Sequence, residues 1–167
     1  GTAYVQGFTW GMERGFDFLF EMDADGSHDP KYLPTMLALA EDGADVVIGS
    51  RYVPGGGTVN WGLSRKLISR GGGLYARTVL GVDIRDLTAG FMCWRRSALE
   101  AINLASVTSN GYSFQIEMKY RALNKGLRLV ETPIVFEDRR VGQSKMSKAI
   151  FVEAMGKVWK LRALRRR

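Results

Sequence analysis

The sequence has little of several residue types that would define a protein class. Among its 167 residues there is one cysteine, Cys93, so no internal disulfide can form and a reducing compartment is the simpler assumption. Cys93 lies in an apolar run and is interpreted as a small buried side chain. The single histidine, His28, is interpreted as a turn residue rather than a base. No apolar run approaches the roughly 18 residues of a membrane-spanning helix.

Acidic residues are scarce at one end of the chain. The formal net charge is +7, but residues 139–167 hold ten Lys or Arg and one acid, Glu153. The basic composition suggests a nucleic-acid-binding module as one class of protein. However, the basic residues cluster in this terminal segment and lack interleaved stacking aromatics. We therefore predict no nucleic-acid partner.

Two aspartates, Asp23 and Asp25, follow an apolar segment that is typical of a buried strand. Side chains alternate in an extended chain, so both carboxylates are expected to point the same way at the strand's carboxyl end, where open α/β sheets bind ligands. Paired carboxylate oxygens with room for water and phosphate suit Mg²⁺ or Mn²⁺. The alternative is a solvated turn. Asp29 and Pro30 have the pattern of a helix N-cap followed by proline.

The remaining apolar pattern predicts an α/β domain. Helices are expected over 2–14, 32–41, 96–102, 113–124 and 148–164, and strands over 17–23, 44–50, 88–94 and 127–138. The strand, helix and strand within 17–50 predict a right-handed parallel crossover, the unit of a doubly wound sheet. The segment 63–81 is helix-like at both ends. Its three glycines at 71–73 predict either a break or close packing.

Three polar residues form a second group of candidates. Arg51 follows the strand at 44–50, so it is expected at the same sheet edge as the aspartate pair, where it would meet an anion. Arg65 and Ser69 are four residues apart and share one helix face. Guanidinium and hydroxyl groups at such positions suit phosphate binding, with a solvated basic face as the alternative.

Six motifs, in order, resemble the family 2 glycosyltransferases of the GT-A fold, and among them the polyprenyl-phosphate (dolichyl-phosphate type) mannosyltransferases. They are DADGSHDP, VVIGSRYVPGG, RKLISRGG, DLTAGF, SFQIE and RRVGQSKM. The resemblance implies a GT-A, Rossmann-like, mostly parallel sheet flanked by helices over 1–147, followed by an amphipathic helix at 148–167. It also implies that a first βαβ portion, which holds the base and ribose of the donor in such enzymes, is missing from this segment.

The resemblance implies inverting, metal-dependent transfer of mannose from GDP-mannose to a polyprenyl monophosphate. Asp23 and Asp25 would hold Mg²⁺ or Mn²⁺, and Asp25 and Asp86 are the predicted catalytic carboxylates. Asp86 would orient or deprotonate the acceptor, with a local cap through Thr88 as its alternative. The runner-up is a family 2 enzyme that moves glucose or another hexose to a lipid phosphate or a glycan.

Motif positions also imply which residues bind the two substrates. The acceptor phosphate is assigned to Arg51, Arg65 and Ser69. The donor phosphates are assigned to Arg139 and Lys145. Glu117 is a further, weak candidate, with an i, i+4 ion pair to Arg121 as its alternative.

The segment 148–164 has apolar residues on one side and charged residues opposite, with Trp159 near a basic end. This pattern is typical of a helix in a membrane interface. The alternative is an ordinary helix that packs on the domain. With a lipid-linked acceptor, the first interpretation predicts a peripheral protein on the cytoplasmic face of an anionic membrane.

Overall fold

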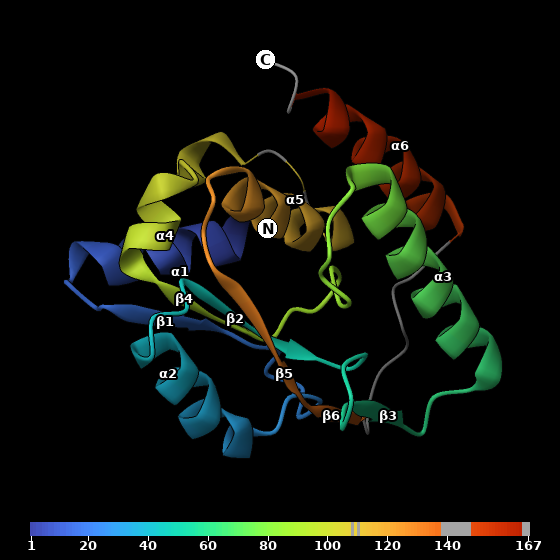
Figure 1. The fold of residues 1–167 in the computed structure, drawn as a ribbon, viewed down its shortest axis with the longest axis horizontal. Coiled ribbons are helices and arrows are strands. Elements are labelled where there is room, and N and C mark those ends of the chain that lie inside the picture. The colour runs from blue at the N-terminus through green and yellow to red at the C-terminus, as the bar shows by residue number, and fades with distance from the viewer. Residues whose placement is uncertain (108, 110, 138–147, 165–167) are drawn as a thin grey trace.

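The computed structural model describes residues 1–107, 109, 111–137 and 148–164. In this part of the chain, helices cover both faces of a four-stranded sheet, and a two-stranded sheet lies beside it (Figure 1). The α-helices are α1 Thr2–Glu13, α2 Leu33–Glu41, α3 Leu63–Leu80, α4 Arg96–Ala101, α5 Tyr112–Asn124 and α6 Lys148–Leu164. The strands are β1 Phe18–Glu21, β2 Val46–Ser50, β3 Gly57–Val59, β4 Met92–Arg95, β5 Leu129–Pro133 and β6 Val135–Glu137, and short 3₁₀ helices span Pro30–Tyr32 and Leu104–Ser106.

The main sheet is mixed and has the strand order β1-β4-β2-β5. β4 pairs antiparallel with β1 and with β2, whereas β2 and β5 are parallel. β1 and β2 therefore run in the same direction, as the crossover pattern predicted, but β4 lies between them. Because β4 runs the opposite way, its first residue lies at the sheet edge where β1 and β2 end.

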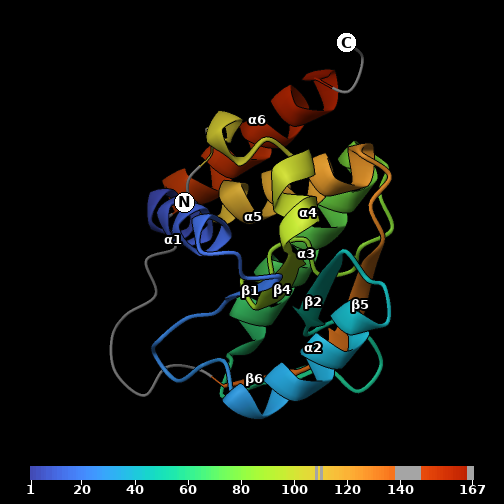
Figure 2. The ribbon, with the colours of Figure 1, turned by 90° about the vertical axis from the view of Figure 1, so that its left-hand side faces the viewer.

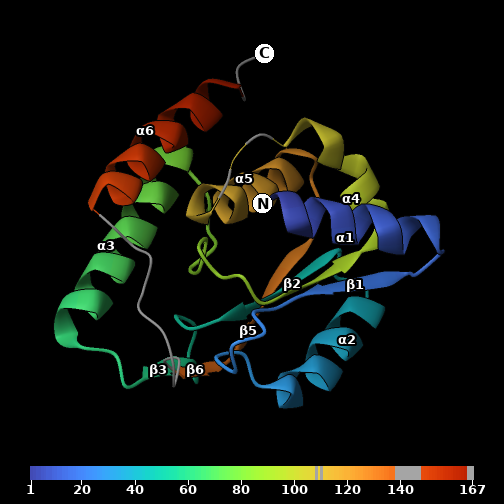
Figure 3. The same cartoon turned by 180° about the vertical axis from the view of Figure 1, so that it is seen from behind.

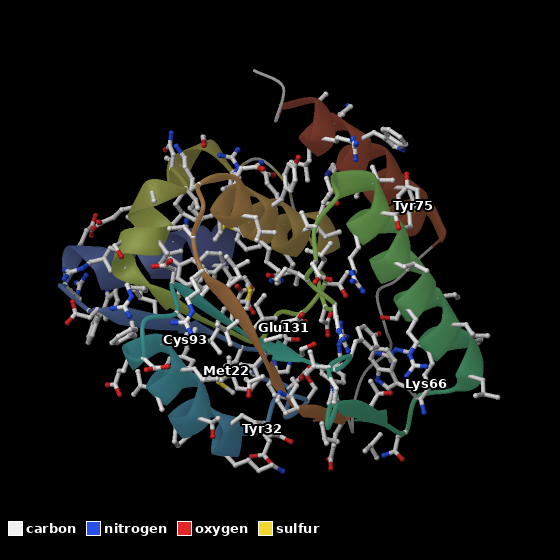
Figure 4. All side chains as sticks on the ribbon, in the orientation of Figure 1. Met22, Tyr32, Lys66, Tyr75, Cys93 and Glu131 are labelled. Carbon is white, nitrogen blue, oxygen red and sulfur yellow. The ribbon has the colours of Figure 1, made fainter. Side chains whose placement is uncertain are left out.

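Two apolar cores lie on opposite faces of this sheet. Figure 2 shows α1, α4 and α5 on one face of the strands and α2 on the other. Side chains alternate along β1, so Leu19 enters the core beneath α1 and α5, whereas Phe18 and Phe20 pack toward α2. Figure 4 shows Met22 and Cys93 on the α2 side, where Cys93 is fully buried as predicted. The sheet is therefore covered on both faces, which leaves its carboxyl edge for ligands.

The three glycines at 71–73 do not break α3, which is continuous from Leu63 to Leu80. A Cβ placed on Gly71 would meet nothing within 4 Å, and one placed on Gly73 would lie at ordinary contact distance, 3.9 Å, from the Arg85 carbonyl oxygen. Tight packing therefore does not require glycine at positions 71 and 73, and the helix continues despite the low helix propensity of glycine. α3 ends at Gly81 in the left-handed conformation.

The last helix, α6, packs on the domain along α3 and α5 (Figure 3). Val158 and Leu161 are buried, and the Tyr75 hydroxyl donates to the Met155 carbonyl oxygen at 3.3 Å. The alternative prediction, a helix that packs on the domain, is confirmed for side chains 155–163. Membrane contact stays a prediction, and Trp159 is 57% exposed. No helix in the described part of the chain is long and apolar enough to cross a bilayer.

Candidate functional site

Segments at one edge of the sheet and the helix α3 line a cavity, and residues of α1, α5 and α6 complete its lining. β1 and β2 end, and β4 begins, at one edge of the sheet, and α3 stands across from that edge (Figures 1 and 3). The cavity has a volume of about 310 Å³. Its lining includes Asp23, Arg51, Arg65, Ser69 and Thr88. The structure thus brings four predicted site residues together from positions up to 46 residues apart in the sequence.

Asp23 is held by two side chains that sequence reasoning did not assign to the site. The Tyr4 hydroxyl donates to its carboxylate at 3.3 Å, and the Asp23 backbone N–H donates to Nδ1 of His28 at 2.9 Å. Burial, with the charges of Asp23 and Glu21, raises the pKa of Tyr4, so the hydroxyl stays protonated and can donate. His28 is buried against Phe91, and this burial lowers its pKa. His28 ends a turn, but it also fixes the backbone of Asp23.

Asp25 lies in different surroundings from Asp23. β1 ends at Glu21, so the side-chain alternation that predicted a matched pair does not extend to Asp25, which is exposed in a turn. Its carboxylate accepts from the backbone N–H of Ser27 at 3.1 Å and from the Ser27 hydroxyl. Asp23 is among the residues that line the cavity, whereas Asp25 is not.

The donors in this turn fit a hard divalent cation. Mg²⁺ usually takes one or two protein carboxylates and completes its octahedron with water and substrate phosphates. The carboxylates of Asp23 and Asp25 and the hydroxyl of Ser27 provide oxygen ligands for such an ion within five residues. The described residues contain no group of three or more His, Cys, Asp or Glu side chains placed to hold a metal. An ion at this turn would therefore share its coordination with substrate oxygens.

Arg51 forms a buried ion pair with Asp86. Its Nε and Nη2 donate to the two carboxylate oxygens of Asp86 at 2.8 and 2.7 Å, and its backbone N–H donates at 3.0 Å. Nη2 also donates to the Thr88 hydroxyl. Burial would raise the pKa of Asp86, but the charge and hydrogen bonds of Arg51 outweigh it and hold this pKa below its ordinary value. Asp86 is therefore a carboxylate that fixes the arginine beside the cavity.

Two further charged side chains hold the loop that carries Asp86. Glu131 accepts from the backbone N–H groups of Arg85 and Asp86 at 2.8 and 2.9 Å. Lys119, which is fully buried, donates to the carbonyl oxygens of Leu87 and Ala89 at 3.2 and 2.7 Å. Burial lowers the pKa of Lys119 to about 8. The position of this loop therefore depends on charged groups from β5 and α5.

Arg65 and Ser69 approach the cavity from α3, as their four-residue spacing predicted. The Arg65 guanidinium lies 4.1 Å from the ring centroid of Trp61, and the Ser69 hydroxyl lies 2.6 Å from the Tyr52 hydroxyl. Arg51 also lies over the Trp61 ring, at 5.5 Å. One indole ring therefore supports both guanidinium groups, each in a cation–π contact.

The other predicted residues lie away from this cavity or outside the described part of the chain. Glu117 accepts from Arg121 at 2.7 Å and from the Ser109 backbone N–H, so its alternative interpretation as an i, i+4 pair is confirmed. Arg139 and Lys145 lie outside the described residues.

Sequence reasoning missed Tyr4, Lys119, Glu131 and the stacking role of Trp61. For Lys119 a local signal existed. It lies three residues after Ile116 and four before Leu123, on the apolar face of α5, where a lysine needs buried acceptors. Tyr4 and Glu131 have no comparable local signal, because their partners come from distant segments.

Comparisons with known proteins identify the family of this chain. A family model described as glycosyl transferase family 2 matches residues 1–102. An undecaprenyl-phosphate mannosyltransferase of Micrococcus luteus is 52% identical over 165 residues, which is 98% of this chain and 68% of that protein. A polyprenol monophosphomannose synthase of Mycolicibacterium smegmatis is 50% identical over 164 residues, which is 97% of this chain and 62% of that protein.

Among solved structures, the fold is similar to a glucosyl-3-phosphoglycerate synthase from Mycobacterium tuberculosis. Its complex with phosphoglyceric acid gives a TM-score of 0.58 and its complex with UDP one of 0.56, each at 15% identity and over 98% of this chain and 53% of that one. At this identity the likeness concerns the fold alone, and it confirms the predicted GT-A type of α/β domain. By its family match and its curated relatives, the chain belongs to glycosyl transferase family 2 and is a glycosyltransferase domain.

Proposed function

We propose that this chain transfers mannose from GDP-mannose to the phosphate of a polyprenyl monophosphate. The observation that carries the proposal is the shared cavity, which Asp23 lines at the sheet edge and Arg65 and Ser69 line from α3. An acidic side suits a metal-bound diphosphate donor, and a cationic side suits a second phosphate. The names of the two curated relatives, which refer to mannose and to polyprenyl lipids, support this choice of sugar and acceptor.

In this proposal the acceptor phosphate lies between α3 and the sheet edge. The planar guanidinium of Arg65 can donate two parallel hydrogen bonds to phosphate, and the Ser69 hydroxyl can donate a third. Arg51 contributes less to phosphate binding than Arg65, because Asp86 already accepts from its Nε and Nη2 and balances its charge. Asp86 is then a positioning residue, and a role as a proton acceptor would require it to leave Arg51.

The acceptor needs no strong base, because a phosphate monoester is already anionic at neutral pH. One of its oxygens forms the new bond to the anomeric carbon while the bond from that carbon to the departing diphosphate breaks. In-line displacement of an α-linked donor inverts the anomeric centre and gives a β-mannosyl phosphate.

Family 2 enzymes generally use divalent metal ions. In our proposal, Mg²⁺ or Mn²⁺ held by Asp23 and Asp25 would neutralise the charge of the diphosphate as it leaves. Asp25 thus acts through the metal. Arg139 and Lys145 are proposed to bind the donor phosphates.

A donor panel tests the proposal. The protein is incubated with a short, water-soluble polyprenyl phosphate, Mn²⁺ and GDP-mannose, UDP-glucose or another sugar nucleotide, and lipid-linked sugar is measured. Product is expected with GDP-mannose and is expected to disappear when the metal is chelated. Product with UDP-glucose alone would reject the mannosyl assignment.

A paired substitution tests the acidic side of the site. Asp25→Asn is expected to reduce turnover by at least about a hundredfold, because the metal loses a charged ligand, while the melting temperature stays unchanged. Asp29→Asn is the matched control. Asn also caps helices well, so this variant keeps both fold and turnover. Normal metal-dependent turnover by Asp25→Asn would remove Asp25 from the mechanism.

A further inference from the structure

The outer face of α3 carries a row of exposed leucines. Leu63, Leu67 and Leu74 are 80%, 71% and 63% exposed. At 3.6 residues per turn, positions four and eleven residues apart lie on the same helix face. Arg65 and Ser69 project from the opposite side of α3, into the cavity. One face of α3 therefore lines the candidate site, and the other presents these three leucines, the leucine stripe, to the surroundings.

Cations run along one flank of the leucine stripe. α3 contains four Lys or Arg residues and no acidic residue. Helical spacing places Lys66, Arg70 and Arg77 next to the stripe on one flank. Figure 4 shows Lys66 in the half of α3 that is remote from α6.

A surface hollow of about 680 Å³ opens beside Leu74. Its lining includes Arg70, Arg77, Arg85 and one acid, Asp83, which pairs with Arg77 at 2.8 Å. Arginine fits phosphate geometry, so this hollow can accept an anionic headgroup next to the leucine stripe.

Two exposed aromatic side chains at another place in the molecule are arranged differently. Trp10 and Phe16 are about half exposed, but their rings stack at 6.2 Å, and the guanidinium of Arg14 covers Trp10 at 3.9 Å. This pair lies at the α1 and β1 end of the molecule, far from α3 (Figure 1). It is a local cluster, whereas the leucine stripe extends along three turns of helix beside basic residues.

We propose that α3 docks on the surface of an anionic phospholipid bilayer, with the leucine stripe in the interface and a lipid headgroup in the hollow that Arg70, Arg77 and Arg85 line. Apolar side chains beside cations and without acids are complementary to such a surface. The inference rests on the proposed function, because a polyprenyl acceptor is itself embedded in a membrane.

The same geometry gives the acceptor a path to the site. Ile68 is 49% exposed and also lines the cavity, so it lies between the leucine stripe and the acceptor face of α3. Gly72 lines the cavity as well, and Gly71 has nothing near it that a side chain would meet. An isoprenoid chain can therefore pass from the bilayer over this side of α3, where the glycines have no side chains, while its phosphate reaches Arg65 and Ser69.

A fluorescent label tests the docking face directly. Cys93 is fully buried, and burial raises the pKa of its thiol to about 12, so a cysteine introduced at the surface is labelled selectively. We would label Leu67→Cys and Leu74→Cys with an environment-sensitive dye, and Phe16→Cys as the matched exposed control. Vesicles with about one third phosphatidylglycerol are expected to shift the emission of both α3 labels to shorter wavelength and to leave the Phe16 label unchanged.

Two outcomes would overturn the proposal. One is an unchanged or equal response of the three labels in protein that sediments with vesicles. The other is an α3 label that responds to protein concentration in the absence of vesicles, which would assign the leucine stripe to a contact between copies of this chain.

Substitutions separate docking from catalysis. Leu67→Glu combined with Leu74→Glu is expected to lower vesicle partitioning at least about tenfold, because two leucines leave the interface and two like charges face the lipid. Turnover of the short, water-soluble acceptor stays unchanged. Wild-type partitioning by this variant would overturn the docking proposal, whereas failure of the wild type to turn over the soluble acceptor would instead count against the proposed function.

The headgroup hollow has its own test. Arg70→Gln and Arg85→Gln are each expected to lower partitioning onto anionic vesicles about fivefold and to have little effect on neutral ones. Added inorganic phosphate at millimolar concentration leaves this difference in place if the ligand is a lipid headgroup. An equal loss on neutral vesicles, or displacement by free phosphate, would overturn the headgroup assignment.

Discussion

The two walls of the cavity are built in opposite ways. On the sheet wall, Arg51 and Asp86 bond to each other, and Glu131 and Lys119 hold the loop between them. On the helix wall, Arg65 lies over an aromatic ring. Oppositely charged side chains that are buried and bonded to each other hold a fixed arrangement, and they do not readily give up that bond to bind a ligand. This difference fits our proposal, in which the sheet wall positions the reacting groups and the helix wall binds the acceptor.

The largest difference between the walls should appear when their charges are neutralised. Asp86→Asn leaves buried Arg51 without its counter-charge, so we expect the free energy of unfolding to fall by about 3–5 kcal/mol. Arg65→Gln on the helix wall should cost less than about 1 kcal/mol, because Arg65 is less buried than Asp86 and its cation–π contact with Trp61 is weaker than a buried ion pair. Urea denaturation of both variants measures this contrast. Equal losses would show that the sheet wall is not held by this pair.

A second contrast concerns pH. Burial raises the pKa of Glu21, whose carboxylate accepts from Gln115 next to the sheet wall, to about 7 from 4.5. The folded protein therefore keeps this proton at pH values where the unfolded chain has lost it. The resulting stabilisation is complete below pH 4.5 and is lost as the pH rises through 7, and it amounts to about 3 kcal/mol at most.

Glu21→Gln should remove this pH dependence, because the amide has no proton to lose. The free energy of unfolding of the variant, relative to wild type, is expected to rise between pH 4.5 and 7.5 in urea denaturation. The matched control is the substitution Glu41→Gln, at a position that is exposed. Lys119 titrates at higher pH than this range. Burial lowers its pKa to about 8, so its contribution to the free energy of unfolding increases as the pH rises from about 8 to 10.5. A relative stability that does not change with pH would contradict the assignment to Glu21.

The smallest expected effect is a gain in stability on the helix wall. Gly71→Ala should raise the free energy of unfolding by about 1 kcal/mol, because helix propensity improves and a new Cβ meets nothing within 4 Å. Gly56→Ala beside the sheet wall should destabilise instead, because its Cβ would lie 2.5 Å from the Ser50 carbonyl oxygen. Thermal melting of the two variants compares the walls. A loss at Gly71 or a gain at Gly56 would contradict the difference between them.

Local patterns predicted much of this architecture. The buried strand before Asp23, the cap at Asp29 and the spacing of Arg65 and Ser69 are all present in the structure. The Asp29 carboxylate accepts from the Lys31 backbone N–H at 2.9 Å, as a cap does. These features depend on residues a few positions apart, and a sequence displays such relations directly.

Long-range pairing could not be predicted in the same way. The position of β4 between β1 and β2 depends on strands more than 40 residues apart, and strand periodicity carries no information on partners. The ion pair of Arg51 with Asp86 spans 35 residues. Asp86 was therefore expected near the acceptor, whereas the structure shows that its immediate partner is an arginine of the same site.

The position of α6 determines which part of α3 can move. The contacts of α6 with Tyr75 and Val79 hold the last turns of α3, whereas Arg65 lies in the first turn, at the far end of a helix about 27 Å long. The glycines at 71–73 separate these two halves, and glycine is the residue that resists bending least. If α3 bends, we therefore expect the bend at these glycines, and it would shift Arg65 at the entrance of the cavity without disturbing the sheet.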